Sequence, residues 1–337
     1  MQKFHYKQKF ELEAGGYLPE LEVAFHTFGK LNEEKNNVIW ICHAFTANSN
    51  PVEWWEGLVG EGKLYDTNRY FVVCANMIGS CYGSTYPLSV NPETEMPYYH
   101  SFPMVTIRDV VRSLDLLRIH LGIEQIFLLT GGSLGGQQAL EWALMLGEKL
   151  LNLVLLATNI RHSAWAIAFN EAQRMAISSD NTWQENSPNA GKEGMRAARA
   201  IALLSYRNYE TYQQTQKEAA ETLALDNFRA SSYQQYQGDK LKKRFDAFAY
   251  WGLSKTMDSH NICRNRGTVA EVLAGIKAKT LVIGIKSDIL FPIEEQKIIA
   301  ENIKNSHLCL IESLYGHDGF LIENHKISEC ITSYINI

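Results

Sequence analysis

A serine flanked by glycines is the residue in this sequence best suited to do chemistry. Ser133 lies in the segment Thr-Gly-Gly-Ser-Leu-Gly-Gly at 130–136, between an apolar run and a helical period. A sharp turn from a strand into a helix would lift its hydroxyl above the edge of a sheet, and glycines let the backbone pack closely there. The start of the helix would add positive potential for a developing oxyanion. The pattern predicts that Ser133 is a nucleophile.

A nucleophilic serine needs a base within hydrogen-bond reach, and the base needs an acid that orients it. Asp288 and His317 each follow a short apolar run. Both would therefore reach the carboxyl edge of a parallel sheet, in the order serine, acid, histidine that accompanies this kind of serine turn. We predict a triad of Ser133, Asp288 and His317. Asp318 is the alternative acid, but its direct adjacency to His317 makes it hard for its carboxylate to orient the ring from behind.

Two backbone amides are expected to stabilise the oxyanion that forms when the serine attacks. One is the amide of Leu134, which directly follows the nucleophile. The second should come from the turn after the apolar run 38–42, where we predict the amide of Phe45. His43 in the same turn is interpreted as a structural residue, not as a second base.

Several short and almost continuously apolar runs must form the sheet that positions these residues. Such runs are typical of strands that are covered on both faces, as in a parallel sheet. Helical periods at 107–121 and 134–146 alternate with them, which predicts a doubly wound α/β fold. Near the start, residues 10–25 alternate around Gly15 and Gly16 and predict an antiparallel hairpin. The apolar runs are 38–42, 70–74, 126–129, 153–156, 281–285 and 308–311.

The middle of the chain has a different character. Residues 161–256 contain no apolar strand and are rich in Ala, Gln, Tyr and Arg. A segment of this length is too long for a loop, so we predict a helical lid inserted into the sheet domain. The core domain would then comprise residues 1–160 and 257–337.

The composition limits the class of partner. The 337 residues are 46% hydrophobic and 20% charged, with a net charge of −5, which is typical of a globular protein without a basic surface for nucleic acid. The amino terminus lacks the apolar run of a secretory signal, and no later stretch is apolar for long enough to cross a bilayer. We expect a cytoplasmic enzyme without nucleic-acid or membrane partners. The six scattered cysteines lack metal-ligand spacing and are interpreted as free thiols, so no metal is predicted.

Sequence motifs along nearly the whole chain carry a family resemblance. The nucleophile segment Gly-Gly-Ser-Leu-Gly-Gly-Gln-Gln-Ala-Leu-Glu-Trp-Ala at 131–143 resembles that of the homoserine O-acetyltransferases, a branch of the α/β-hydrolase superfamily in methionine biosynthesis. The resemblance implies an α/β-hydrolase fold and transfer of an acyl group from acyl-CoA to an amino-acid hydroxyl through an acyl-serine. Acetyl-CoA would be a cosubstrate, no bound cofactor would be needed, and the lid would mediate a homodimer. Further matching segments are 42–46, 76–85, 91–94, 102–103, 106–109, 236–238, 244–247, 287–292 and 316–318.

The resemblance also implies which residues hold the acceptor. Arg199 and Tyr206 match the lid residues that bind homoserine, and Asp318 matches the acid beside the catalytic histidine. The seven-residue spacing of Arg199 and Tyr206 places them on one helix face, and a guanidinium and a carboxylate are the expected complements of an amino acid. The neighbouring Arg196 and Arg207 are not predicted to take part.

Departures from the family pattern leave the substrate pair open. The segment 45–51 is shorter than usual and lacks a glycine and a histidine, Phe45 replaces leucine, Leu134 replaces methionine and Phe248 replaces asparagine. We expect these changes to surround the acyl and acceptor pockets. Acetyl and succinyl donors, and homoserine and serine acceptors, therefore remain alternatives. A serine hydrolase of esters or thioesters and a non-catalytic ligand receptor of the same fold are the other two candidates.

Overall fold

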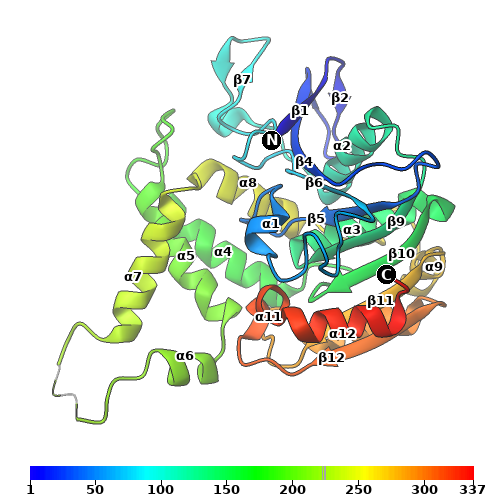
Figure 1. Cartoon of the computed structure of the whole chain (residues 1–337). Helices are drawn as coiled ribbons and strands as arrows, with labels where there is room; N and C mark the ends of the chain where they lie inside the picture. The colour runs from blue at the N-terminus through cyan, green and yellow to red at the C-terminus, as the bar shows by residue number, and fades with distance from the viewer. Residues whose placement is uncertain (222, 224) are drawn as a thin grey trace.

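An eight-stranded sheet forms the centre of the computed structural model, which describes residues 1–221, 223 and 225–337 (Figure 1). Its strands are β1 (Gln2–Tyr6), β4 (Leu21–Phe28), β5 (Val38–Cys42), β6 (Phe71–Ala75), β9 (Ile126–Gly132), β10 (Leu150–Leu156), β11 (Lys279–Ile285) and β12 (Ser306–Ile311). Their order is β1-β4-β6-β5-β9-β10-β11-β12. The six strands from β6 to β12 in this order pair in parallel, whereas β1 and β4 are antiparallel to their neighbours. The predicted mainly parallel α/β fold is confirmed.

The sequence predicts one antiparallel hairpin over residues 10–25, but the structure places the two parts of this segment in different sheets. The glycine turn joins two short strands, β2 (Phe10–Glu11) and β3 (Tyr17–Leu18), into a small hairpin. The strand that begins at Leu21 instead pairs with β1 and β6 in the main sheet. A second small hairpin consists of β7 (Val90–Asn91) and β8 (Met96–Pro97).

Both faces of the sheet are covered by apolar side chains, as the continuous runs predict. Within β5, Trp40 points to one face and meets Trp142 edge-on at 4.8 Å, while Ile39 and Ile41 pack in the other layer with Ile327. The first layer includes α2 (Ile107–His120), α3 (Leu134–Leu146), α9 (Val269–Ala274) and α10 (Ile293–Asn302). The second layer includes α12 (Asn324–Tyr334), with the short helices α1 (Pro51–Trp54) and α11 (Gly319–Ile322) nearby (Figure 1).

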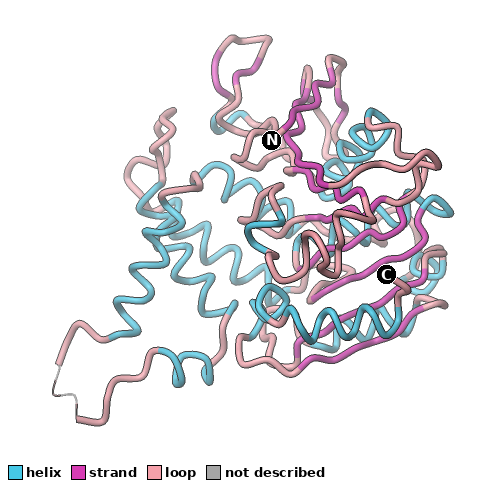
Figure 2. The backbone as a smooth tube through the Cα atoms, in the orientation of Figure 1, coloured by secondary structure: helices cyan, strands magenta, loops and turns pink. Residues whose placement is uncertain are grey.

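Besides α9, the described chain between β10 and β11 contains five helices. They are α4 (Ala164–Ser178), α5 (Lys192–Tyr206), α6 (Tyr209–Thr215), α7 (Arg229–Lys242) and α8 (Ala247–Asp258). They gather at one side of the sheet, and strands of the central sheet do not enter this group (Figure 2). The division of the chain into a core domain and a lid domain at residues 160 and 257 stays a prediction. Among the described residues, no helix combines the length and the apolar character that a membrane crossing requires.

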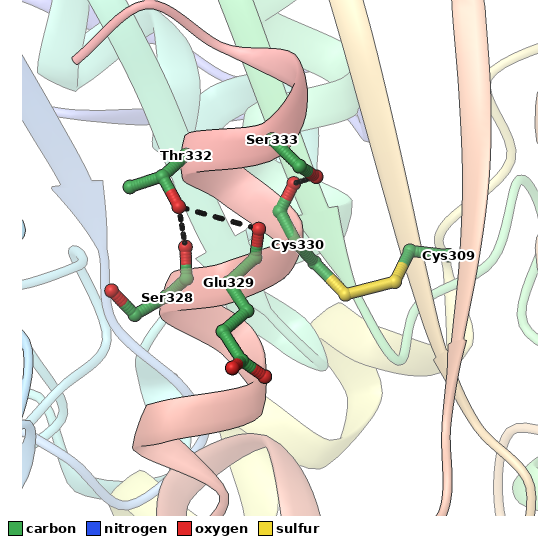
Figure 3. The surroundings of a disulfide bond; sticks show 6 residues. All are labelled: Cys309, Ser328, Glu329, Cys330, Thr332 and Ser333. Atoms are coloured by element: carbon green, nitrogen blue, oxygen red, sulfur yellow. Dashed lines mark hydrogen bonds between the residues drawn. A yellow bond between two sulfur atoms is a disulfide. The ribbon is translucent and has the colours of Figure 1, made fainter.

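One pair of cysteines corrects the interpretation of all six as free thiols. Cys309 on β12 and Cys330 on α12 form a disulfide, with their Cα atoms 6.4 Å apart (Figure 3). Cys42, Cys74, Cys81 and Cys263 are free. The bond therefore ties the carboxyl-terminal helix to the last strand of the sheet.

Removal of this disulfide is expected to destabilise the fold. Its cysteines are 21 residues apart, and a loop of this size predicts a loss of about 3 kcal/mol in the free energy of unfolding for Cys330→Ser. Urea unfolding with and without reductant measures this loss, with Cys263→Ser as the control. Equal transitions for oxidised and reduced protein would contradict the expectation.

Candidate active site

Ser133 occupies the sharp turn between β9 and α3. Its backbone has φ 56° and ψ −125°, a conformation that residues with a side chain rarely adopt. The neighbouring glycines are needed because a Cβ at Gly131 would lie 2.4 Å from the backbone of Gly135, and one at Gly135 would lie 2.1 Å from the carbonyl oxygen of Cys42. Strained backbone of this kind persists where the surrounding structure holds it, commonly at functional sites. The turn presents the Ser133 side chain to a cavity.

Asp288 and His317 are in direct contact beside this cavity. The Nδ1 of His317 lies 2.6 Å from Oδ2 of Asp288, and both side chains are buried. The other oxygen of Asp288 accepts hydrogen bonds from the amides of Leu290 at 2.8 Å and Phe291 at 2.9 Å. Three donors therefore satisfy this carboxylate. Since the N–H at Nδ1 of His317 donates to this carboxylate, its Nε2 carries no hydrogen and can act as a base.

Aromatic rings hold the imidazole of His317 from two sides. The ring of Phe291 stacks on it at a centroid distance of 5.0 Å, and the ring of Phe320 meets it edge-on at 5.2 Å. Such packing restricts rotation of the imidazole. The packing of Phe291 and Phe320 therefore supports the orientation of the His317 ring that Asp288 sets.

Asp318 makes a different contact from the one that an orienting acid requires. Its Oδ2 lies 2.9 Å from Nη1 of Arg207, at the end of α5. Asp288, and not Asp318, touches the ring of His317. Arg207 is a residue that the sequence interpretation set aside. Its position next to Tyr206 is the only signal that could have drawn attention to it.

The two predicted oxyanion donors lie in turns that pack against each other. The side-chain amide of Gln138 donates to the carbonyl oxygens of His43 at 3.1 Å and Leu134 at 3.2 Å, which links the turn after β5 to the start of α3. Within the described part of the chain, neither the Phe45 amide nor the Leu134 amide has a hydrogen-bond acceptor. Both amides are therefore available to an oxyanion.

His43 contributes to the shape of this turn. Its Nε2 accepts from the amide of Met77 at 3.3 Å, and its Nδ1 lies 2.9 Å from the carbonyl oxygen of Ala44. Complete burial lowers the pKa of His43 to about 4, so the ring is neutral near pH 7. These contacts agree with its interpretation as a structural residue.

A cavity of about 290 Å³ connects the predicted nucleophile with the predicted acceptor residues. The guanidinium of Arg199 lies 5.3 Å from the centroid of the Tyr206 ring, and no acidic residue in the described ranges forms an ion pair with it. Burial raises the pKa of Tyr206 to about 12, so its phenol is neutral. The cavity thus offers the guanidinium of Arg199, which is not engaged in an ion pair within the described ranges, and the carboxylates of Asp318 and Glu53. Its lining includes Ala44, Phe45, Thr46, Glu53, Ser133, Arg199, Tyr206, Arg244, His317, Asp318 and Phe320.

The positions of Phe248 and Arg244 differ from what the sequence led us to expect for the pocket. Phe248, which we expected near the acyl or acceptor pocket, instead lines a separate aromatic cavity with Trp183 and Trp251. Arg244 lines the active-site cavity and was not predicted, although it begins one of the matching segments. Its Nη1 donates to the carbonyl oxygen of Thr46 and to the hydroxyl of Tyr82, both at 2.5 Å. It therefore joins the lid to the turn that carries Phe45.

The described residues were also compared with the ligand sets that bind metal ions. Among the described residues, no group of three or more His, Cys, Asp or Glu side chains is arranged to hold a metal ion. The chemistry available from the arrangement is nucleophilic attack by Ser133, proton transfer by His317 and oxyanion stabilisation by backbone amides.

Known proteins that are similar to this chain share its fold, and several of them are homoserine O-acetyltransferases. Residues 37–323 match the family model described as alpha/beta hydrolase fold. A homoserine O-acetyltransferase of Cyclobacterium marinum is 51% identical over 331 residues, which cover 98% of this chain and 94% of that protein. The crystal structure of homoserine O-acetyltransferase from Bacillus anthracis superposes with a TM-score of 0.91 at 25% identity, covering 100% of this chain and 97% of that one. An acetylester hydrolase from Corynebacterium glutamicum, 24% identical, superposes with a TM-score of 0.86 over 100% of this chain and 96% of that one.

Proposed function

The chain belongs to the homoserine O-acetyltransferase family of α/β hydrolases, which transfers an acetyl group to homoserine in methionine biosynthesis, and we propose that Ser133 carries that group as a covalent intermediate. In this proposal acetyl-CoA is the donor and no bound cofactor takes part. The triad is Ser133, Asp288 and His317. The observation that carries the proposal is that a single cavity is lined by Ser133, His317, Arg199 and Asp318.

The first half-reaction acylates the serine. Nε2 of His317, oriented through Nδ1 by Asp288, takes the proton of the Ser133 hydroxyl while Oγ attacks the thioester carbonyl. The amides of Leu134 and Phe45 donate to the tetrahedral oxyanion. The carbon–sulfur bond then breaks, and His317 returns the proton to the departing thiol of coenzyme A.

The second half-reaction transfers the acetyl group to the acceptor. His317 takes the proton of the homoserine hydroxyl, whose oxygen attacks the acyl-serine carbonyl. The bond to Oγ of Ser133 breaks, and Oγ recovers its proton from His317 as O-acetylhomoserine forms. Arg199 would pair with the α-carboxylate of the acceptor and Asp318 with its ammonium group, with Tyr206 packed beside Arg199.

Arg199→Leu is expected to impair use of the acceptor but not of the donor. Loss of a charge-assisted hydrogen bond of about 1.5–3 kcal/mol predicts a decrease of roughly 10- to 150-fold in kcat/KM for homoserine. The rate of thiol release in the acylation step should change little, and more acyl-enzyme should drain to water. Single-turnover assays from preformed acyl-enzyme, with and without homoserine, measure this partition.

Arg196→Leu provides a matched control for that experiment. Arg196 lies on the same helix but pairs with Asp239 at 2.6 Å and does not line the cavity. It should therefore leave the partition unchanged. If Arg199→Leu used homoserine as well as the wild type does, Arg199 would have no role in acceptor binding.

Hydrolysis of acetyl esters is the alternative that the same fold accommodates, since function depends on the site and not on the fold. A thiol-release assay that crosses acetyl-CoA and succinyl-CoA with homoserine and serine distinguishes the candidates. We expect acetyl-CoA with homoserine to be the preferred pair, because the matching relatives carry that name. Thiol release that no acceptor accelerates would favour the hydrolase.

The assembly and the location of the protein are part of the same proposal. We propose a cytoplasmic homodimer formed through the lid, with small molecules and not nucleic acid or membrane as the other partners. Exposed apolar side chains on the lid helices support an association there, including Trp165, Met175 and Leu204, which are 54%, 62% and 54% exposed. Light scattering of the wild type and of a Leu204→Lys variant tests the lid as the interface.

A further inference from the structure

We propose that Arg207 is a positioning residue that holds the carboxylate of Asp318 for the ammonium group of the acceptor. This inference rests on the proposed function, because it assumes that Asp318 meets the acceptor in the active-site cavity. Arg207 would thereby set the preference for an amino acid over an acceptor that lacks the amino group.

The ion pair between Arg207 and Asp318 is largely shielded from water. Nη1 of Arg207 lies 2.9 Å from Oδ2 of Asp318, and the two side chains are only 17% and 16% exposed. The guanidinium also lies 5.9 Å from the centroid of the Tyr315 ring, which limits its movement. Nη1 of Arg207 has no hydrogen-bond acceptor among the described residues, so the contact is electrostatic, and screening by water is weak at such exposure.

The backbone around this pair is fixed as well. A Cβ at Gly316, which has φ 59°, would lie 3.0 Å from the carbonyl oxygen of Tyr206 and 3.1 Å from the carbonyl carbon of Arg207. The Thr211 hydroxyl donates to the carbonyl oxygen of Leu314. The end of α5 and the start of α6 are therefore packed against the turn that carries His317 and Asp318. The backbone that carries Arg207 is therefore held in place next to Asp318.

Arg207 and Asp318 border different cavities. Asp318 lines the active-site cavity together with Ser133, whereas Arg207 lines a second cavity of about 190 Å³ with Tyr212 and Tyr315. Arg207 thus reaches the carboxylate from behind and does not border the space where the acceptor would bind. In the described part of the chain, neither carboxylate oxygen of Asp318 accepts a hydrogen bond, so the carboxylate can still accept from an ammonium group.

Arg199, in the middle of α5, and Arg207, just past its end, therefore have different tasks. Arg199 lines the active-site cavity without an acidic partner in the described ranges, and is free to meet a substrate carboxylate. Arg207 is committed to a protein carboxylate and keeps it in place. A zwitterionic acceptor would place its carboxylate at Arg199 and its ammonium group at Asp318. Loss of Arg207 should weaken recognition of the acceptor's ammonium group, which Asp318 binds, and not recognition of its carboxylate.

The test compares homoserine with 4-hydroxybutyrate, which has the same hydroxyl and carboxylate but no amino group. Preformed wild-type acyl-enzyme is first mixed with each acceptor, and homoserine must be acetylated for the proposed function to stand. Arg207→Gln should then lower kcat/KM for homoserine by roughly 10- to 100-fold, the size of a lost charge-assisted contact. Its kcat/KM for 4-hydroxybutyrate and its rate of acylation by acetyl-CoA should change less than about threefold, within the scatter of a surface substitution.

Two further variants keep the result interpretable. Arg207→Lys should recover most of the activity toward homoserine, and the double variant Asp318→Asn/Arg207→Gln should be no slower than Asp318→Asn alone, because the two residues act as one unit. The double variant also avoids a buried unpaired carboxylate, so that it tests the role of Arg207 even if the single variant folds poorly. Equal losses with both acceptors, or additive losses in the double variant, would overturn the proposal. Unchanged use of homoserine by Arg207→Gln would overturn it as well.

Discussion

Ser133→Ala is expected to reduce acetyl transfer by on the order of 10⁶-fold, the loss that follows removal of the nucleophile in other serine triads. The reason is that no other hydroxyl can take the same place at the turn between β9 and α3, where the backbone of Ser133 has φ 56°. Steady-state thiol release with acetyl-CoA and homoserine measures the change. The variant should also fail to form a covalent acetyl adduct.

A second serine provides the control for this substitution. Ser113 is fully buried in α2 and its hydroxyl donates only to the carbonyl oxygen of Val110 at 2.6 Å, far along the chain from the turn. Ser113→Ala should retain transfer activity close to that of the wild type. Transfer that survives in Ser133→Ala at wild-type rate would show that another residue is the nucleophile.

His317→Ala is expected to lose about as much activity as Ser133→Ala, because the members of a triad act as a unit. Asp288→Asn should lose less, on the order of 10⁴-fold, because the amide cannot hold the imidazole in the same tautomer. The contact between Nδ1 of His317 and Oδ2 of Asp288 at 2.6 Å is the interaction that this variant changes. Both losses should appear already in the acylation step, as measured by the burst of thiol release.

Asp318→Asn separates the two neighbouring acids. Because Asp318 contacts Arg207 and not His317, its loss should impair acceptor use while acylation by acetyl-CoA stays near the wild-type rate. The opposite pattern, with normal acylation in Asp288→Asn and none in Asp318→Asn, would transfer the orienting role to Asp318.

The sheet could be predicted because its strands are buried on both faces. Runs such as 38–42 coincide with β5 (Val38–Cys42), since apolar residues on both sides of a strand leave no alternation to misread. The prediction for β10 was too short, because Leu151 is 42% exposed and Asn152 interrupts the apolar run. Strands as short as β7 and β8 carry too few residues for a recognisable pattern.

The chemistry of the site could be predicted better than its supporting contacts. Ser133, Asp288 and His317 each follow a strand, so chain order and sheet geometry indicate where they meet. Arg207 lies just beyond the end of α5, where the spacing rule for one helix face no longer applies, and its partner is 111 residues further along the chain. The bond between Cys309 and Cys330 depends on how α12 packs against β12. The spacing of two cysteines contains no information about such packing.

The most direct test of the account is a mass measurement on the acyl-enzyme, followed by a chase. The protein is incubated with acetyl-CoA alone, the adduct is located by peptide mapping, and homoserine or buffer is then added. We predict one acetyl group on Ser133 that homoserine removes at least tenfold faster than water does, as a charge-assisted acceptor site implies, with O-acetylhomoserine as the product. An adduct on another residue, or an adduct on Ser133 that homoserine removes no faster than buffer, would contradict the account.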